Sequence, residues 1–395
     1  MAAPVPIQTA IPPKWKNTLS DAYFVNSVAI SGRGGLVLAG TFYHDYNSSY
    51  PVNRPDAPPF GTYCFDRLGN QLWSDKFDGF EGIYSVAISR DGSIAASGGW
   101  RLAAQGIVRA YCAANGSQLL SYSTGNGRVS SVALSDNGAT LVAASYSPSP
   151  AALNRVYLFQ RSDGLFPPNP AVFQLEGNSS PLAVAIAPDG GWFVVGCFDG
   201  SVYLVENANG SIGKSFRWQA QSPKEIRSIA VSRGQDIVAG GADGNVYIFT
   251  VDSLRRKKVC DNFPTEHDIR WVAISANGGV VSAVMNVGQG SNIQTGLLEI
   301  LQNRSGSLRR IRQQSLDHPP NCTSIDDEAK FVAVADGYSK ATNPHGCFYL
   351  FDGPNGNQLW KSPTDKMNWP MFISADGSSI AAGSDDGSVY YFMTA

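Results

Sequence analysis

The sequence predicts an all-β fold, and three observations lead to that class. Short runs rich in Val, Ile, Tyr and Phe recur along the 395 residues, and Gly turns separate them. The phrase "SVAIS", or a variant of it, returns eight times at intervals of 43 to 58 residues. No segment shows a sustained helical period of apolar positions. Four short strands in each of eight repeats predict an eight-bladed β-propeller of four-stranded antiparallel blades, forming one domain over residues 1–395.

The central residue of the recurring phrase marks each repeat. The seventh copy, "TSIDDEAK", is eroded, and a seven-bladed alternative treats it as part of a loop. The eight anchors are Val28, Val86, Val132, Val184, Ile229, Val272, Thr323 and Met371.

Each repeat contains four runs in the same order. The first run ends in a tight turn such as Asp91-Gly92 or Asn137-Gly138, residue pairs that accept positive φ angles. A second apolar run ("SIAASGG"), a third aromatic run ("RVYLFQ") and a weaker fourth run ("GNQLWSDKF") complete the pattern. The first two runs show little polar alternation, which is typical of strands that neighbouring layers cover on both faces.

The eighth repeat stops after its third run, "SVYYF", and would leave an open sheet edge. Trp73 lies in a fourth run, 13 residues before the anchor Val86, and Trp15 lies 13 residues before Val28. We therefore expect residues 12–20 to be the outer strand of the last blade, which closes the ring. Residues 1–11 are expected to be an N-terminal tail.

Composition favours neither nucleic acid nor an anionic membrane as partner, since 16% of residues are charged and the formal net charge is −2. No apolar run is long enough to span a membrane. Several Asn-x-Ser/Thr sequons favour a periplasmic or secreted protein, with any signal peptide absent from this chain. We expect a monomer. The six cysteines lack Cys-x-x-Cys spacing, so most are expected to be buried free thiols.

Two sets of residues resemble known repeats. The stretches "ISRDGSIAASGG" and "FDGSVYLVENANG" resemble WD-repeat blades, although the paired Gly-His and Trp-Asp signature is absent. The stretch "YLFDGPNGNQLWKSPT" resembles the repeat of pyrroloquinoline-quinone (PQQ) enzymes and their cofactor-free relatives, in which a Gly turn precedes a Leu-Trp-Lys strand. The resemblance implies an eight-bladed propeller of the cofactor-free type. Enzymes, assembly factors and scaffolds share this architecture, so the resemblance alone does not assign a function.

Sequence motifs give little support to catalysis. The chain has no Walker loop, no His-Glu-x-x-His, no Gly-x-Ser-x-Gly and no adjacent cysteines of the kind that often cover the quinone in PQQ enzymes. We expect no cofactor and no metal, and we expect the four histidines to be solvated loop residues: His44, His267, His318 and His345. The favoured function is a non-catalytic binding or scaffold propeller for a protein, peptide or glycan partner. The alternative is a PQQ-like oxidoreductase, or a hydrolase or lyase that uses the central funnel.

The residues two before each anchor are predicted to ring one mouth of the propeller. Arg227 and Arg270 fall on successive blades, and guanidinium groups near aromatic rings are suited to hold a carboxylate or an acidic peptide. In the alternative interpretation each arginine pairs with a local acid such as Glu225, Glu266 or Asp268. The predicted ring, with the neighbouring Trp271 added, is Asn26, Tyr84, Ser130, Leu182, Arg227, Arg270, Trp271, Asn321 and Trp369.

Two further features are candidate recognition surfaces. The long insertion at residues 41–60 is rich in Tyr, Asn and Pro and includes His44, Tyr46 and Tyr50; neutral insertion is the alternative explanation. Two basic runs are expected in the outer-strand region of blades five and six, either as one positive rim patch or as charges that block edge pairing. Their residues are Arg255, Arg256, Lys257, Lys258, Arg309, Arg310 and Arg312.

Overall fold

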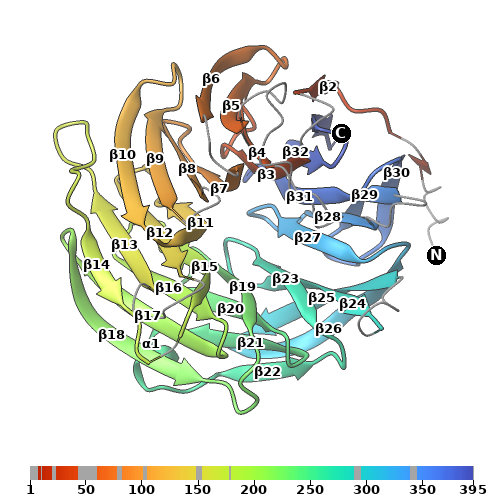
Figure 1. Cartoon of the computed structure of the whole chain (residues 1–395). Helices are drawn as coiled ribbons and strands as arrows, with labels where there is room; N and C mark the ends of the chain where they lie inside the picture. Colours follow the sequence, from red (N-terminus) through yellow and green to blue (C-terminus); the bar gives the residue numbers. More distant parts are fainter. Residues whose placement is uncertain are drawn as a thin grey trace.

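The computed structural model describes residues 8–9, 11–19, 24–42, 60–77, 82–100, 105–147, 154–177, 179–288, 295–338 and 345–394. Within these residues the strands form eight blades around one axis, and the strands of each blade follow one another outward from that axis (Figure 1). Blades one and two share a single bridge between Phe42 and Gly82, which joins them into one sheet of eight strands. The predicted fold class is confirmed.

The first four blades each contain four consecutive strands. Their bounds are β3 (Phe24–Ile30), β4 (Leu36–Phe42), β5 (Phe60–Asp66) and β6 (Gln71–Phe77); β7 (Gly82–Ile88), β8 (Ile94–Trp100), β9 (Gly106–Cys112) and β10 (Gln118–Gly125); β11 (Arg128–Leu134), β12 (Thr140–Tyr146), β13 (Arg155–Gln160) and β14 (Ala171–Gln174); and β15 (Pro181–Ile186), β16 (Trp192–Cys197), β17 (Ser201–Ala208) and β18 (Ser211–Gln219).

Blades five to seven repeat this order, and blade eight takes its outer strand from the N-terminal part of the chain. Their bounds are β19 (Ile226–Val231), β20 (Asp236–Gly241), β21 (Asn245–Thr250) and β22 (Asp261–Pro264); β23 (Ile269–Ile274), β24 (Val280–Val287), β25 (Thr295–Arg304) and β26 (Ser307–Leu316); β27 (Pro320–Ile325), β28 (Phe331–Tyr338), β29 (His345–Asp352) and β30 (Gln358–Thr364); and β31 (Asn368–Ile373), β32 (Ser379–Ser384), β33 (Ser388–Met393) and β2 (Trp15–Thr18).

The second serine of "SVAIS" closes the hairpin between the first two strands of a blade. In blade two the Ser89 hydroxyl accepts the Ile94 N–H (3.0 Å) and donates to the Asp91 carboxylate (2.6 Å). Gly92 completes the turn with a φ of 74°, in the left-handed region that Gly adopts without strain. Ser135, in blade three, makes the equivalent contacts.

The first serine of the phrase links neighbouring blades. The Ser27 hydroxyl of blade one accepts the N–H of Val86, the anchor of blade two (2.9 Å). Ser85 in turn accepts the N–H of the next anchor, Val132 (3.1 Å). Equivalent bonds join blade three to blade four and blade five to blade six. The repeated phrase therefore encodes both the hairpin within a blade and the contact between blades.

Glycine in the second strand makes room for the next blade. A Cβ atom on Gly98 of blade two would lie 2.4 Å from the Val129 side chain of blade three. A Cβ on Gly240 of blade five would lie 2.6 Å from the Ile269 side chain of blade six. Real Cβ atoms do not approach other atoms this closely, so the Gly-rich second strands are a packing requirement of the ring.

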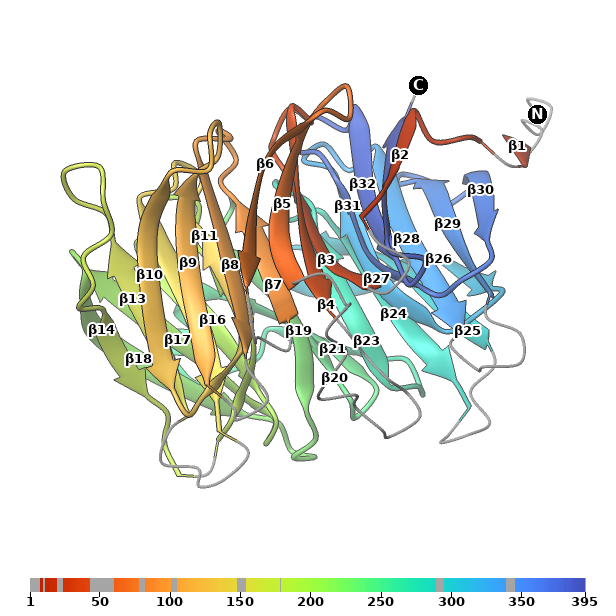
Figure 2. The same cartoon turned by 45° about the horizontal axis from the view of Figure 1, so that its top comes forward.

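The N-terminal strand closes the ring as predicted. Strand β2 pairs antiparallel with β33, and its register places Trp15 opposite Tyr391. The tail adds a feature that the sequence did not predict, because β1 (Gln8–Thr9) pairs in parallel with β30 of blade seven. Figure 2 shows β2 beside the last blade and β1 further out, near β30.

The part of the chain that the structure describes contains one short helix, α1 (Val251–Arg255), and no helix with the length and apolarity of a membrane crossing. The helix begins after Thr250 because the Thr250 and Ser253 side chains each accept or donate to the other residue's backbone in a capping box. The expected buried free thiols are confirmed at Cys64, Cys197, Cys322 and Cys347, whereas Cys112 is half-buried and Cys260 is exposed.

Candidate functional site

The innermost strands of all eight blades enclose a central cavity of about 570 Å³. Every position of the predicted mouth lines this cavity, including Trp271. Sequence spacing therefore located a set of residues that the fold brings together around the axis. Their role in binding stays a prediction.

A β-bulge places each mouth residue. In blade two, Ile83 pairs with Gly99 and Ser85 with Gly98, so Tyr84 is the extra residue of its strand. The same shift falls at Arg270 of blade six and at the corresponding position of the other blades. A bulge re-aims one side chain while the strand continues. The repeated bulge thus turns one residue per blade toward the axis.

The two mouth arginines differ in their pairing. Arg227 bonds to Glu225 (2.7 Å) and lies 3.9 Å from Asp268, so the local-acid interpretation is correct for this residue. Arg270 makes no hydrogen bond or ion pair within the described residues. Burial and the neighbouring Arg227 guanidinium lower the pKa of Arg270. A half-buried cation without a partner is costly, and an anionic ligand would relieve that cost.

Aromatic rings complete the walls of the cavity. The Tyr84 side chain is 44% exposed, packs 4.6 Å from the Trp100 ring and has a pKa that burial raises. The Trp271 ring meets Phe372 of blade eight edge-on, with centres 6.2 Å apart. Together with Arg270 these rings form a surface suited to a ligand with an apolar body and a carboxylate.

The two mouth asparagines are occupied by neighbouring backbone groups. The Asn26 amide donates to the Tyr84 carbonyl (3.4 Å), and the Asn321 amide donates to the Asn368 carbonyl (2.6 Å). These amide donors therefore contribute to the contact between blades. This use leaves them less suited to the repeated hydroxyl contacts that a glycan requires.

Ion pairs bridge the far end of the axis, a feature that the sequence did not predict. The Arg90 guanidinium, in the first turn of blade two, bonds to the Asp327 carboxylate of blade seven. Arg233 of blade five lies 2.9 Å from Asp136 of blade three. Both pairs join turns of blades that are not adjacent. A ligand is therefore expected to enter the cavity from the mouth.

Asp385 makes stability depend on pH at the mouth. Burial raises its pKa to about 7, although the Trp369 indole donates a hydrogen bond to it. The folded chain thus holds this proton more tightly than the unfolded chain, and its contribution to stability falls as pH rises from about 4 to about 7. We expect wild-type protein to lose about 1 kcal/mol relative to Asp385→Asn between pH 5 and pH 8. Urea unfolding of both proteins measures this difference, and a constant difference would contradict the assignment.

The remaining sequence candidates are placed less favourably. His44, Tyr46 and Tyr50 lie outside the described residues. Within the described residues, no contact joins the two basic runs.

The first basic run is not in an outer strand, and that expectation was wrong. Arg255 is the last residue of α1 and pairs with Glu206 of blade four (2.8 Å), and β22 begins only at Asp261. The capping box at Thr250 starts a helical turn before the outer strand can form. The second run does lie in the outer strand β26, where Arg310 pairs with the fully buried Glu299 (2.7 Å).

Comparison with known proteins supports the propeller class. The family model "WD domain, G-beta repeat" matches residues 170–205, which extend from β14 into β17. The WD-repeat resemblance is thus confirmed over that segment, whereas the PQQ-like resemblance stays a prediction. No curated protein sequence matches the chain.

Several solved structures share the fold at low identity. Chaetomium thermophilum Sqt1 bound to the N-terminus of the ribosomal protein L10 has 17% identity and a TM-score of 0.67, with 96% of this chain and 100% of that chain covered. Sqt1 from the same organism, solved by MR, has 16% identity and a TM-score of 0.67 over 97% and 99% of the two chains. A further Sqt1 structure gives 16%, 0.68, 96% and 98%. These likenesses show the fold alone.

Proposed function

We propose that the chain is a non-catalytic binding propeller, and that its mouth receives a carboxylate-bearing segment of a partner protein. The observation that carries this proposal is the unpaired Arg270 guanidinium in the wall of the central cavity. The charged residues that line the cavity are Glu225, Arg227 and Arg270, so the paired Arg227 and Glu225 cancel and one positive charge remains.

The size of the cavity supports a peptide-sized ligand. A volume of about 570 Å³ lies within the range of small-molecule pockets and accommodates a few side chains rather than a folded domain. Sqt1, which shares the fold, is described in complex with the N-terminus of a ribosomal protein, so this architecture does hold a chain terminus in another case. A protein or peptide is thus favoured over a glycan, because the mouth amides are already engaged.

Charge reversal at Arg270 is expected to abolish capture of acidic peptides. Fluorescent peptides rich in Asp, titrated by anisotropy, should bind the wild-type chain more tightly than matched Lys-rich peptides. Arg270→Ala should weaken binding about tenfold, and Arg270→Glu should remove it, since each tenfold step corresponds to about 1.4 kcal/mol. Arg309→Ala, on the exposed face of β26, is the matched control and should bind normally.

Two outcomes would contradict the proposal. One is equal binding of acidic and basic peptides to the wild-type chain. The other is unchanged binding of acidic peptides by Arg270→Glu. Binding of a neutral oligosaccharide that Arg270→Glu retains would instead favour the glycan alternative. Export and the monomeric state stay predictions of the sequence.

A further inference from the structure

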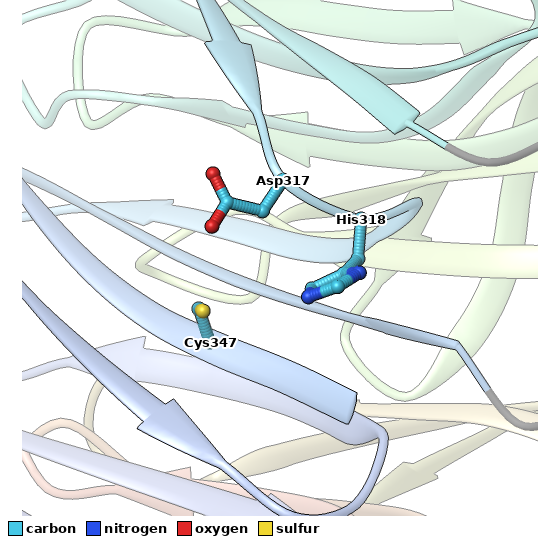
Figure 3. A group of neighbouring side chains, drawn as sticks. All are labelled: Asp317, His318 and Cys347. Atoms are coloured by element: carbon cyan, nitrogen blue, oxygen red, sulfur yellow. The ribbon is translucent and has the colours of Figure 1, made fainter. Parts of the chain in front are cut away.

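A cluster of metal-binding side chains lies in blade seven, outside the central cavity. Asp317 and His318 belong to the turn between β26 and β27, and Cys347 lies in β29. One possible ligand atom from each of these three residues lies within 4.8 Å of the others. Figure 3 shows Asp317 and His318 on the chain that leads into β27, with Cys347 on the strand beside it. The connections into a first strand and into a third strand both lie at the mouth end of a blade, so the cluster belongs to the mouth face.

His345 is a fourth candidate ligand. It precedes Cys347 by two residues in β29, and such residues share one face of a strand. Its ring centre lies 6.2 Å from that of His318. Two imidazoles on one tetrahedral ion have ring centres about 5 Å apart, so a rotation of the exposed His345 side chain is enough to bring both rings to one ion.

We propose that Asp317, His318, His345 and Cys347 form a site for a divalent transition-metal ion of the zinc type. The donors are one thiolate sulfur, two imidazole nitrogens and one carboxylate oxygen, which is a set that suits tetrahedral Zn²⁺. Ligand atoms around such an ion lie about 3.3 to 3.6 Å apart, so the cluster must contract by about 1 Å. Binding releases the Cys347 thiol proton to solvent.

A buried carboxylate already holds the backbone of two ligands. Asp336 is fully buried and accepts the His318 N–H (3.0 Å), the Cys347 N–H (2.6 Å) and the Tyr349 hydroxyl (2.8 Å). These bonds fix the turn before β27 against β29 without an ion. The frame of the site is therefore present before the metal arrives, which lowers the ordering cost of binding.

Access and charge at the site follow from its two sides. The Cys347 side chain is only 3% exposed, whereas Asp317 is exposed, so the ion enters from the Asp317 side. The Lys361 ammonium forms an ion pair with the Asp317 carboxylate. This lysine supplies a positive charge where the metal would supply one, and it competes with the ion for the carboxylate.

Cobalt titration tests the site, because Co²⁺ replaces Zn²⁺ and its bonds to thiolate are visible. The reduced, metal-free full chain should show a thiolate-to-cobalt charge-transfer band and tetrahedral d–d absorption that saturate at one equivalent. Cys347→Ser should remove the charge-transfer band. His318→Ala should weaken binding by about tenfold or more, since even outer partners of a metal site contribute this much. Cys260→Ser, which removes an exposed thiol elsewhere, should titrate as wild type.

Lys361→Met provides a test that loss of folding cannot imitate. It removes the competing cation and leaves all four ligands, so it should tighten Co²⁺ binding. Competition with Zn²⁺ should then bleach the cobalt spectrum and raise the melting temperature of the wild-type chain. The proposal is overturned if no charge-transfer band appears at one equivalent, if Cys347→Ser retains the band, or if Lys361→Met weakens binding. It stands on the geometry of blade seven and is independent of peptide capture at Arg270.

Discussion

A chain that lacks residues 1–19 is expected to lose about 4 kcal/mol or more of its unfolding free energy, because this segment joins the two ends of the ring. The Trp15 ring stacks on Tyr391 of blade eight, with centres 5.2 Å apart and planes within 1° of parallel. The same ring lies 5.8 Å from Phe65 of blade one, and its indole N–H bonds to the Arg67 carbonyl (3.1 Å). Removing one buried large aromatic alone costs about 3 kcal/mol.

The polar contacts of the closing strand bridge the same two blades. The Lys16 ammonium lies 2.8 Å from the Asp386 carboxylate of blade eight, and this pair raises the pKa of Lys16 despite its partial burial. The Asn17 amide bonds to the Gly69 carbonyl of blade one (2.6 Å). Deletion thus exposes the edge of β33 and separates blade eight from blade one.

Urea unfolding followed by circular dichroism measures the effect of the deletion. The matched control lacks residues 1–10 and retains β2, so it loses only the two-residue strand β1 and should lose less than about 1 kcal/mol. Trp15→Ala should fall between the two proteins. Equal stability of the 1–19 deletion and the wild type would contradict closure of the ring by β2.

Gly240→Val is expected to destabilise the chain by about 3 kcal/mol through overpacking between blades five and six. A Cβ at this position would lie 2.6 Å from the Ile269 side chain and 2.8 Å from that of Val272. Both neighbours are buried and β-branched, with 0% and 1% exposure, so neither can rotate away cheaply. The inserted side chain must push two blades apart.

Two variants separate overpacking from a general effect of replacing glycine. Gly35→Ala places a Cβ no closer than 3.9 Å to a neighbour and should change stability by less than about 0.5 kcal/mol. In the double variant Gly240→Ala/Ile269→Ala, the new methyl occupies space that the isoleucine leaves. The combined loss should therefore be smaller than the sum of the two single losses. An additive result would show that the two side chains do not share this space.

The repeated parts of the fold were predictable because each repeated residue makes a repeated contact. The two serines of "SVAIS" close a hairpin and join neighbouring blades, so their spacing carries the blade pattern. The closing strand was predictable from one number, the distance from Trp15 to its anchor. The mouth was predictable because a bulge falls at the same place in every innermost strand.

The unrepeated contacts were not predictable from one sequence. Arg90 and Asp327 meet across the axis, and no spacing along the chain relates a turn of blade two to a turn of blade seven. The pairing state of Arg270 likewise depends on neighbours from several blades. The His345 and Cys347 pair did carry a signal, since alternate residues of a strand share one face, but the approach of His318 depends on the preceding turn.

Photo-crosslinking from the mouth tests the binding proposal most directly. A benzophenone amino acid replaces Leu182, the mouth residue of blade four, and in a second protein it replaces the exposed Arg309. The proposal predicts that an acidic peptide becomes crosslinked at position 182, that Arg270→Glu abolishes this crosslink, and that position 309 remains unlabelled. Equal labelling at 182 and 309, or labelling at 182 that survives Arg270→Glu, would contradict the assignment of the mouth as the binding site.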